Sequence, residues 1–310
     1  MRVFVAGATG VIGRRVVEEL VTGGHDVSAV ARTDAKASWL AAKGAAPTRV
    51  DLFDGDALSR AVRGHQAVVN LATHIPTGNA MMFRRGWRQN DRLRTVAGRR
   101  LAGAAARAGV EAFVQESITL LYADGGTAWL DEDTAVDPTV FTRSAIEAEG
   151  HARQFAAGPG RGVVLRFAQF VAPDSAHTVQ MVAKATKGTL LLLGRPGGYE
   201  PFVHVDDAAT AVVAALECPS GTYNVVEGVP STRADHAAAW SRALDRPVAL
   251  PPAWLGRLPR LSGLARSRRP SHAAFTEATG WRPRHPDLRS VWPALAHPDG
   301  VRAVGGGGRR

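Results

Sequence analysis

The sequence is poor in the residues that build disulfides, metal sites and membrane spans. Its 310 residues include one cysteine, Cys218, which excludes an internal disulfide and leads us to expect a reducing, cytoplasmic environment. The ten histidines are scattered and show no spacing typical of a metal site. No apolar run reaches the roughly 18 residues that a membrane-spanning helix needs, so we expect no contact with a membrane.

Nucleic-acid binding is also not expected, although the chain carries a net charge of +10 from 38 basic and 28 acidic residues. The basic residues are spread along the chain, and only RSRR (266–269) and the final GGGGRR form local clusters. No helix-turn-helix, RNP or zinc-finger pattern accompanies them. We interpret the charge as general basicity of an arginine-rich protein.

Buried strands and amphipathic helices alternate along the first half of the chain. The strands are uniformly apolar, which predicts a parallel sheet with helices on both faces. The predicted strands are residues 2–7, 26–32, 66–73 and 110–117, with another that ends near 48–53, and a long helix is predicted over 87–108. The expected fold is therefore α/β, with a Rossmann-type doubly wound parallel sheet.

A glycine-rich turn joins the first predicted strand to the first helix. Gly7, Gly10 and Gly13 form the pattern G-x-x-G-x-x-G. Glycine allows the backbone to turn tightly and to approach a pyrophosphate, and the helix N-terminus offers unpaired N–H groups to it. The turn predicts a dinucleotide site; the alternative is a turn that only packs the helix on the strand.

The end of the second predicted strand indicates which dinucleotide binds. An acidic residue there would bind the ribose hydroxyls of NAD, whereas an arginine would bind the 2′-phosphate of NADP. Arg32 occupies this position, Lys36 lies nearby, and Asp34 falls in the following loop. The pattern favours NADP(H) over NAD(H), with an exposed arginine of no function as the alternative.

The order of motifs along nearly the whole chain resembles the extended branch of the short-chain dehydrogenase/reductase superfamily, the NAD-dependent epimerases and dehydratases. The similar segments are VAGATGVIG (5–13), VDLFD (50–54), VVNLAT (68–73), VVLRFAQFVAPDS (163–175), FVHVDDAATAVVAAL (202–216), GTYNVVEG (221–228) and EATGWRPRHP (277–286). Together with the glycine turn and Arg32, the resemblance implies a cofactor site formed by Gly7, Thr9, Gly10, Val11, Ile12, Gly13, Arg32, Asp51, Leu52, Leu71, Ala72 and Thr73.

The resemblance also implies a division of the chain. Residues 1–170 would form the NAD(P)-binding Rossmann domain, and 171–301 a smaller substrate-binding lobe interleaved with it. A small-molecule substrate would bind in the cleft between them, and a homodimer is common in the superfamily. The glycine-rich end, 302–310, is expected to be a disordered tail.

The resemblance fails at the catalytic positions. Members of the family carry a tyrosine that exchanges a proton with the substrate, and a lysine four residues later that lowers the pKa of this tyrosine. In FTRSAIEAEG (141–150) these positions hold Phe141 and Ala145, and the chain contains no Y-x-x-x-K at all. Ile118 occupies the usual catalytic serine or threonine position. Proton transfer of this kind typically contributes a factor of about 10²–10⁴ in rate, so a substitute is needed if the reaction requires a proton.

Tyr122, Ser117 and Thr119 are the predicted catalytic substitutes, because they lie at the carboxyl end of the fifth strand. The alternative is structural: Ser117 and Thr119 would satisfy backbone groups, and Tyr122 would pack under a loop. Further candidates with a structural alternative each are Glu116, His74 and Asn90, Asp206 as a helix N-cap or a substrate contact, and Arg143 as a replacement for the lost lysine charge.

Three functions remain open from the sequence. The first is an NADP(H)-dependent oxidoreductase that acts on a carbonyl or hydroxyl of a small metabolite with a non-standard proton donor. The second is a non-redox isomerase, dehydratase or cyclase on the same scaffold, and the third is a non-catalytic NADP(H) sensor.

Overall fold

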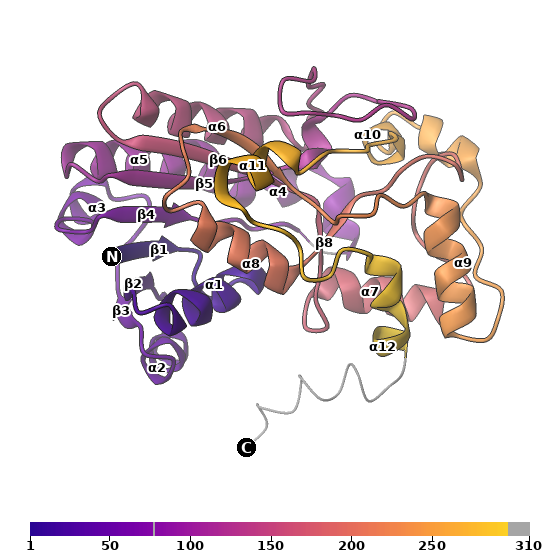
Figure 1. Cartoon of the computed structure of the whole chain (residues 1–310), viewed down its shortest axis with the longest axis horizontal. Coiled ribbons are helices and arrows are strands. Elements are labelled where there is room, and N and C mark those ends of the chain that lie inside the picture. The colour runs from indigo at the N-terminus through magenta and orange to yellow at the C-terminus, as the bar shows by residue number, and fades with distance from the viewer. Residues whose placement is uncertain (77, 297–310) are drawn as a thin grey trace.

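A seven-stranded parallel sheet forms the centre of the protein (Figure 1). The computed structural model describes residues 1–76 and 78–296. The strand order is β3-β2-β1-β4-β5-β6-β9, so the chain winds from the middle of the sheet to one edge and then to the other. The strands are β1 (Arg2–Ala6), β2 (Asp26–Val30), β3 (Ala46–Thr48), β4 (Ala67–Asn70), β5 (Ala112–Ile118), β6 (Arg161–Phe167) and β9 (Gly221–Val225).

Helices cover both faces of this sheet, as the uniformly apolar strands predict. One apolar core lies under α1 (Val11–Thr22), α2 (Asp34–Ala42), α8 (Val205–Ala214) and α11 (Ala273–Thr279). The other lies under α3 (Gly55–Ala61), α5 (Gly98–Arg107) and α6 (Arg143–Ala156). The expectation of a doubly wound Rossmann-type α/β fold is confirmed.

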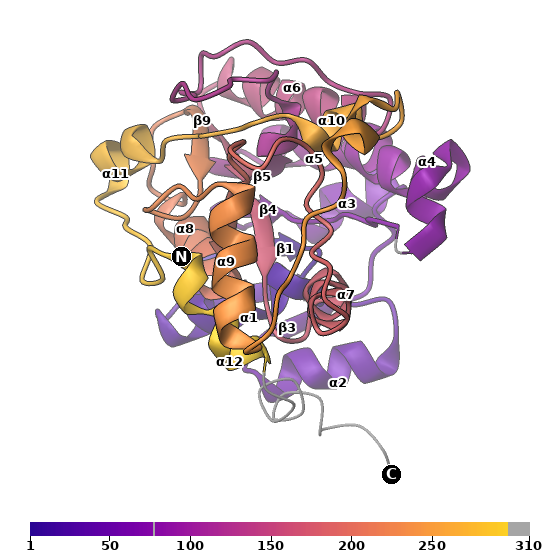
Figure 2. The same ribbon diagram turned by 90° about the vertical axis from the view of Figure 1, so that its right-hand side faces the viewer.

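A smaller lobe lies beyond the carboxyl ends of the strands, on the side that faces the viewer in Figure 2. It contains a two-stranded parallel sheet of β7 (Gln169–Val171) and β8 (Phe202–His204), with α7 (Ala176–Ala185), α9 (Arg233–Ala243) and α12 (Trp292–Ala296). Its core centres on Trp240 and Trp292, whose rings stack at 5.3 Å. The remaining short elements are η1 (Gly78–Met82), α4 (Arg84–Arg92), η2 (Leu93–Ala97), η3 (Thr119–Leu121), η4 (Ala253–Arg257), α10 (Ser262–Ala265) and η5 (Leu288–Ser290).

Two predicted elements differ from those observed. The third strand covers Ala46–Thr48 instead of 48–53, because Val50 and Leu52 pack against the core from a loop and so imitate a strand. The long helix predicted over 87–108 is three segments, α4, a π-helical turn (η2) and α5, and the turn directs Arg94 into the interior. No described helix meets the length and apolarity that crossing a membrane requires.

The elements of the two expected domains alternate along the chain in the observed fold. Both α8 and β9 come after residue 170, yet they pack on and extend the large sheet. The division at 170 therefore stays a proposal about function, with the lobe made mainly of β7, β8, α7, α9 and α12. The predicted tail, 302–310, lies outside the described residues.

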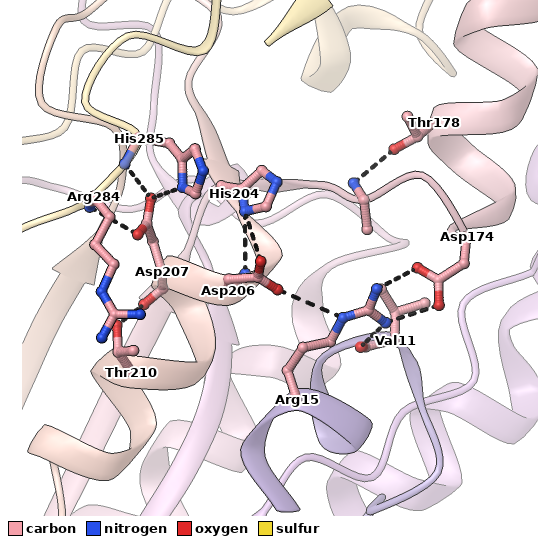
Figure 3. Close-up of polar contacts among 11 residues, drawn as sticks. Val11, Arg15, Asp174, Thr178, His204, Asp206, Asp207, Thr210, Arg284 and His285 are labelled. Carbon is pink, nitrogen blue, oxygen red and sulfur yellow. Dashed lines mark hydrogen bonds and ion pairs between the residues drawn. The ribbon is translucent and has the colours of Figure 1, made fainter. Parts of the chain in front are cut away.

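The start of α8 ties the C-terminal segment to the sheet (Figure 3). Asp207 is fully buried, and its carboxylate accepts the backbone N–H groups of Arg284 at 2.8 Å and His285 at 2.9 Å. The N-cap of α8 is His204, whose Nδ1 accepts the N–H of Asp206 at 3.3 Å. The prediction of Asp206 as the N-cap is therefore wrong, because the helix begins two residues earlier.

Replacing Asp207 tests this anchor. Asp207→Ala leaves two backbone N–H groups without an acceptor in a buried site, which is expected to lower the free energy of unfolding by roughly 2–4 kcal/mol. Asp206→Ala is the matched control, since this neighbour is half-exposed, accepts no backbone N–H from the C-terminal segment, and should change stability by less than about 1 kcal/mol. Urea denaturation measures both values, and equal effects of the two variants would contradict the anchoring role.

Candidate active site

A cavity of about 2160 Å³ lies between the large sheet and the lobe. It is lined by residues that follow β1, β2, β4 and β6, together with the end of β5, and therefore occupies the carboxyl edge of the sheet. Ligand cavities typically measure about 300–1,000 Å³, so this one has room for a dinucleotide and a second molecule.

The glycine-rich turn forms one end of the cavity. Gly7 has a φ of +83°, and a Cβ atom there would lie 2.4 Å from the carbonyl oxygen of Leu71. A Cβ atom on Gly13 would lie 2.1 Å from the carbonyl oxygen of Gly7. Gly10 is the N-cap of α1 and supplies no side-chain cap, in contrast to Thr33 of α2 and Asp54 of α3. The N–H groups of the first turn of α1 thus remain available to an anion.

Three cationic side chains line the cavity beyond β2. They are Arg32, Lys36 and Arg49, of which Arg49 also pairs with Asp34. Asp51 and Leu52 line the same end, and Asp51 Oδ1 accepts the N–H of Phe53 at 2.9 Å. This end has the charge that a 2′-phosphate requires.

The cavity brings together eleven of the twelve residues predicted to bind the cofactor. Gly13 does not line it, because it is the residue at which α1 packs against the glycine turn. The lining residues are Gly7, Thr9, Gly10, Val11, Ile12, Arg32, Asp51, Leu52, Leu71, Ala72 and Thr73. A backbone cradle, an uncapped helix N-terminus and a basic patch fit a nicotinamide dinucleotide.

Apolar side chains occupy the three positions at which the sequence motifs predict the family's catalytic residues. Ile118 and Phe141 line the cavity, and Ala145 is fully buried. Phe141 packs against Trp87, with ring centroids 5.7 Å apart. Phe167 and Phe170 line the cavity as well, at 5.3 Å from one another. This half of the cavity is therefore walled by aromatic rings.

The alternation of side chains along β5 decides which residues face the cavity. Glu116 and Ile118 line it, and Ser117 between them points to the other side of the sheet. Thr119, 2% exposed, does not line it either. The sequence singled out Ser117 and Thr119 for their hydroxyl groups, without knowledge of the direction of each side chain.

Tyr122 and Ser117 belong to a buried polar network under α6. Ser117 Oγ donates to Glu149 at 2.7 Å, and Arg166 contacts both oxygens of Glu149 at 2.8 and 2.9 Å. Tyr122 Oη donates to Asn224 at 2.8 Å and accepts from Arg166 at 3.0 Å. Tyr122 is fully buried and is not part of the cavity lining. Tyr122 therefore has the environment expected for a structural role, which was the alternative to a catalytic one.

The charges of this network support the same interpretation. Burial raises the pKa of Tyr122 above its usual value, against the opposing effect of Arg166. Burial also acts to raise the pKa of Glu149, but the hydrogen bonds and charge of Arg166 outweigh it and hold this pKa below its usual value. The network is thus a neutral hydroxyl beside a tight ion pair, as expected for a structural element.

The floor of the cavity contains a second buried ion pair that the sequence did not reveal. Glu116 is 6% exposed and receives Arg94 Nη2 at 2.8 and 3.1 Å. Glu116 was a candidate because of its place on the strand. Arg94 could not be found from spacing alone, since it reaches the cavity floor only through the π-helical turn η2.

The other candidates have different environments. His74 and Arg143 are exposed and line the cavity. Asn90 is fully buried, and its Oδ1 accepts the backbone N–H of His74 at 3.0 Å, so it fixes the loop after β4. Asp206 contacts Arg15 and does not line the cavity. The described residues contain no cluster of three or more metal-ligating side chains.

Arg15 connects the dinucleotide-binding helix to the lobe (Figure 3). Its guanidinium donates to both oxygens of Asp174 at 2.8 Å, and its Nε lies 3.7 Å from Asp206. Asp174 follows β7, and Asp206 lies in the first turn of α8. The ion pairs hold α1, and with it the glycine turn, against the two segments that lead into the lobe.

These features define a dinucleotide-binding Rossmann protein with a second, substrate-sized space beside the dinucleotide site. The chain belongs to the NAD-dependent epimerase/dehydratase family, whose model matches residues 3–226. The resemblance inferred from the sequence motifs is thereby confirmed.

Individual relatives differ in what their names describe. A 3-diazoavenalumate denitrifying reductase from Streptomyces is 32% identical over 93% of this chain and 98% of its own. A human epimerase family protein solved with NADPH is 25% identical, with a TM-score of 0.76 over 96% of this chain and 99% of its own. UDP-glucose 4-epimerase of Thermus thermophilus, solved with NAD, has a TM-score of 0.77 at 23% identity over 98% and 100% of the two chains, and shows the fold alone.

Gly13→Ala tests the contact between the glycine turn and α1. The added Cβ would have to displace the Gly7 carbonyl, so we expect NADPH affinity to fall by at least about 100-fold, as measured by fluorescence titration. Gly150→Ala is the matched control in α6, where an added Cβ meets no atom within 4 Å. It should leave affinity unchanged and stabilise the helix by about 0.5–1 kcal/mol. Full NADPH affinity in Gly13→Ala would contradict the assignment.

Proposed function

We propose that this protein is an NADP(H)-dependent reductase that replaces an aromatic diazo group by hydrogen. The observation that carries the proposal is the apolar character of Ile118, Phe141 and Ala145, the three positions at which the family places its proton-transfer groups. Among the described residues no tyrosine lines the cavity. The site therefore suits a reduction in which the protein supplies no proton.

The chemistry of the acceptor distinguishes the candidate reductions. A carbonyl that accepts a hydride becomes an alkoxide and needs a proton, so the loss of Tyr and Lys would cost a factor of about 10²–10⁴. An arenediazonium ion already carries a positive charge and has dinitrogen as its leaving group. When it accepts a hydride, the C–N bond breaks, a C–H bond forms, and dinitrogen leaves. Atoms and charge balance without any proton.

The residues of this chain would act by binding and by excluding water. Gly7, Gly10 and the first turn of α1 would hold the pyrophosphate, and Arg32 with Lys36 the 2′-phosphate. The bound NADPH would supply the hydride. Phe141, Trp87 and Phe170 would offer flat surfaces to an aromatic substrate and keep water from the reacting carbon.

The electrostatics of the cavity floor agree with a cationic acceptor. A lysine at position 145 would place a positive charge beneath a diazonium ion, whereas alanine places none there. The charge of Arg94 behind the cavity wall is balanced by Glu116, so this pair adds no net positive charge. The relative at 32% identity, named as a denitrifying reductase of a diazo compound, supports the same class of substrate.

Turnover of a simple arenediazonium salt tests the proposal. With benzenediazonium as the probe, we expect loss of the NADPH absorbance together with release of one dinitrogen and one benzene per NADPH oxidised. The control is the same mixture with Gly13→Ala protein, which corrects for direct reaction between the salt and NADPH. A rate equal to that control, with NADPH bound, would reject the proposed reaction.

Phe141→Tyr separates diazo reduction from carbonyl reduction. Restoring the family's hydroxyl should change kcat for benzenediazonium by less than about threefold, because no proton transfer limits the reaction. Tyr122→Phe should also leave kcat within about threefold, since Tyr122 lies in the buried network. An increase of about 100-fold in kcat for Phe141→Tyr would instead show that proton transfer limits the reaction.

The basic patch beyond β2 leads us to propose NADP(H) over NAD(H). Arg32→Ala should raise the dissociation constant of NADPH about 10- to 100-fold, as expected for losing a charge-assisted hydrogen bond to phosphate, and should change that of NADH by less than about threefold. Arg63→Ala is an exposed control outside the cavity lining and should change neither. Equal loss of NADPH and NADH affinity in Arg32→Ala would remove the preference.

A further inference from the structure

A glutamine and a glutamate meet on the lobe side of the cavity. Gln169 is the first residue of β7, half-buried, and lines the cavity. Glu200 lies two residues before β8, is 3% exposed, and lines the cavity beside it. Because β7 and β8 pair in parallel with Gln169 opposite Phe202, the two side chains are brought together, and Gln169 Nε2 donates to Glu200 Oε1 at 2.5 Å.

Two buried guanidinium groups keep Glu200 ionised. Arg233 is fully buried, and its Nη2 donates to Glu200 Oε2 at 2.6 Å. Arg268 is buried nearby, and burial lowers its pKa to about 10, which leaves it charged at neutral pH. Burial raises the pKa of Glu200 above its usual value, and Arg233 and Arg268 oppose this rise. The carboxylate form is assigned from the direct contact with Arg233, because a neutral Glu200 would leave this buried guanidinium without a carboxylate partner in the described structure.

An ionised carboxylate accepts hydrogen bonds and donates none. Gln169 must therefore turn its NH₂ group toward Glu200, and its amide cannot rotate to the opposite orientation without placing two oxygen atoms in contact. The carbonyl Oε1 of Gln169 is then left free, and no hydrogen bond from a described residue reaches it. The pair acts as an oriented acceptor in the wall of the cavity.

Arg233 also fixes the neighbouring wall. Its Nη2 donates to the backbone oxygens of Arg266 at 2.7 Å and Leu264 at 3.4 Å, both in a segment that lines the cavity. One buried arginine thereby positions the acceptor and the chain opposite it. Phe170, the residue after Gln169, supplies an aromatic surface beside the acceptor.

We infer that Gln169 is a specificity-determining residue whose Oε1 accepts a hydrogen bond from the substrate, and that the substrate is an aromatic diazo compound with a hydroxyl donor on its ring. The inference rests on the proposed function for the reacting group, and on the Gln169–Glu200–Arg233 geometry for the donor. A site built to bond a substrate hydroxyl discriminates strongly against an analogue without it.

Two matched probes test the donor. Meta-hydroxybenzenediazonium and meta-methoxybenzenediazonium differ in the O–H group, and both substituents withdraw electrons from the reacting carbon to a similar extent. The assay is run at about pH 5, because the diazonium group acidifies the phenol and a neutral buffer would remove its proton. With saturating NADPH we expect kcat/KM to be at least about 10-fold higher for the hydroxy probe, and the difference to appear mainly in KM. A ratio near one, or a preference for the methoxy probe, would overturn the inference.

Gln169→Met assigns the effect to the acceptor, because methionine has similar length and no amide. The ratio of the two probes should fall to within about twofold of one, while turnover of the methoxy probe is retained. The matched control is Gln180→Met, another glutamine of the cavity lining on α7, for which the ratio should stay at its original value. An unchanged kcat/KM ratio of the two probes in Gln169→Met would show that a different group binds the hydroxyl.

A binding measurement keeps this inference separate from the proposed reaction. In the presence of NADP⁺, calorimetry should show meta-cresol binding at least about 10-fold more tightly than meta-methylanisole, and Gln169→Met should abolish the difference. If no diazonium probe is turned over but this binding preference holds, the reaction is wrong and the donor site stands. If turnover occurs and neither probe pair shows a preference, the donor site is wrong and the reaction stands.

Discussion

The close contact between β1 and α1 is the constraint on which the site depends. Atoms of Gly7 occupy the space where a side chain at position 13 would be, and Leu71 occupies the space beside Gly7. Only glycine at both positions lets the helix begin directly above the strand, with its first N–H groups facing the cavity. The ion pairs of Arg15 with Asp174 and Asp206 then fix the segments that lead into the lobe relative to α1. The dinucleotide end and the substrate end are therefore set by one rigid contact.

A second constraint is the two-residue period of β5. It sends Glu116 and Ile118 to the cavity and Ser117 to the opposite face, where Ser117 donates to Glu149, the partner of Arg166. This network holds α6 against β6 through side chains that do not line the cavity. Phe141 and Ala145, where the sequence motifs predict a tyrosine and a lysine, take no part in its hydrogen bonds.

Sequence patterns predicted those parts of the molecule that local chemistry determines. The glycine turn, the basic residue after β2 and the uniformly apolar strands each depend on a few neighbouring residues, and the structure agrees with the sheet and the cavity they imply. The direction of Tyr122 was not predictable, because it depends on where β5 ends and on Asn224, about a hundred residues later. The pairs Arg94–Glu116 and Gln169–Glu200 join distant segments through a π-helical turn and a small second sheet, and neither leaves a pattern in the sequence.

The charges around the cavity connect these points to the reaction. An enzyme of this family that protonates its product must place an acid and a cation next to the nicotinamide, and both would disfavour a positively charged acceptor. In this protein Ala145 carries no charge, and Arg143 at the start of α6 is an exposed cation in the cavity lining. Arg32, Lys36 and Arg49 lie beyond β2, Arg94 is matched by Glu116, and Arg233 is matched by Glu200. For the proposed reaction, the aromatic wall and the Gln169 acceptor would select a substrate by its shape and its hydroxyl group, and the departure of dinitrogen would complete the bond-breaking step.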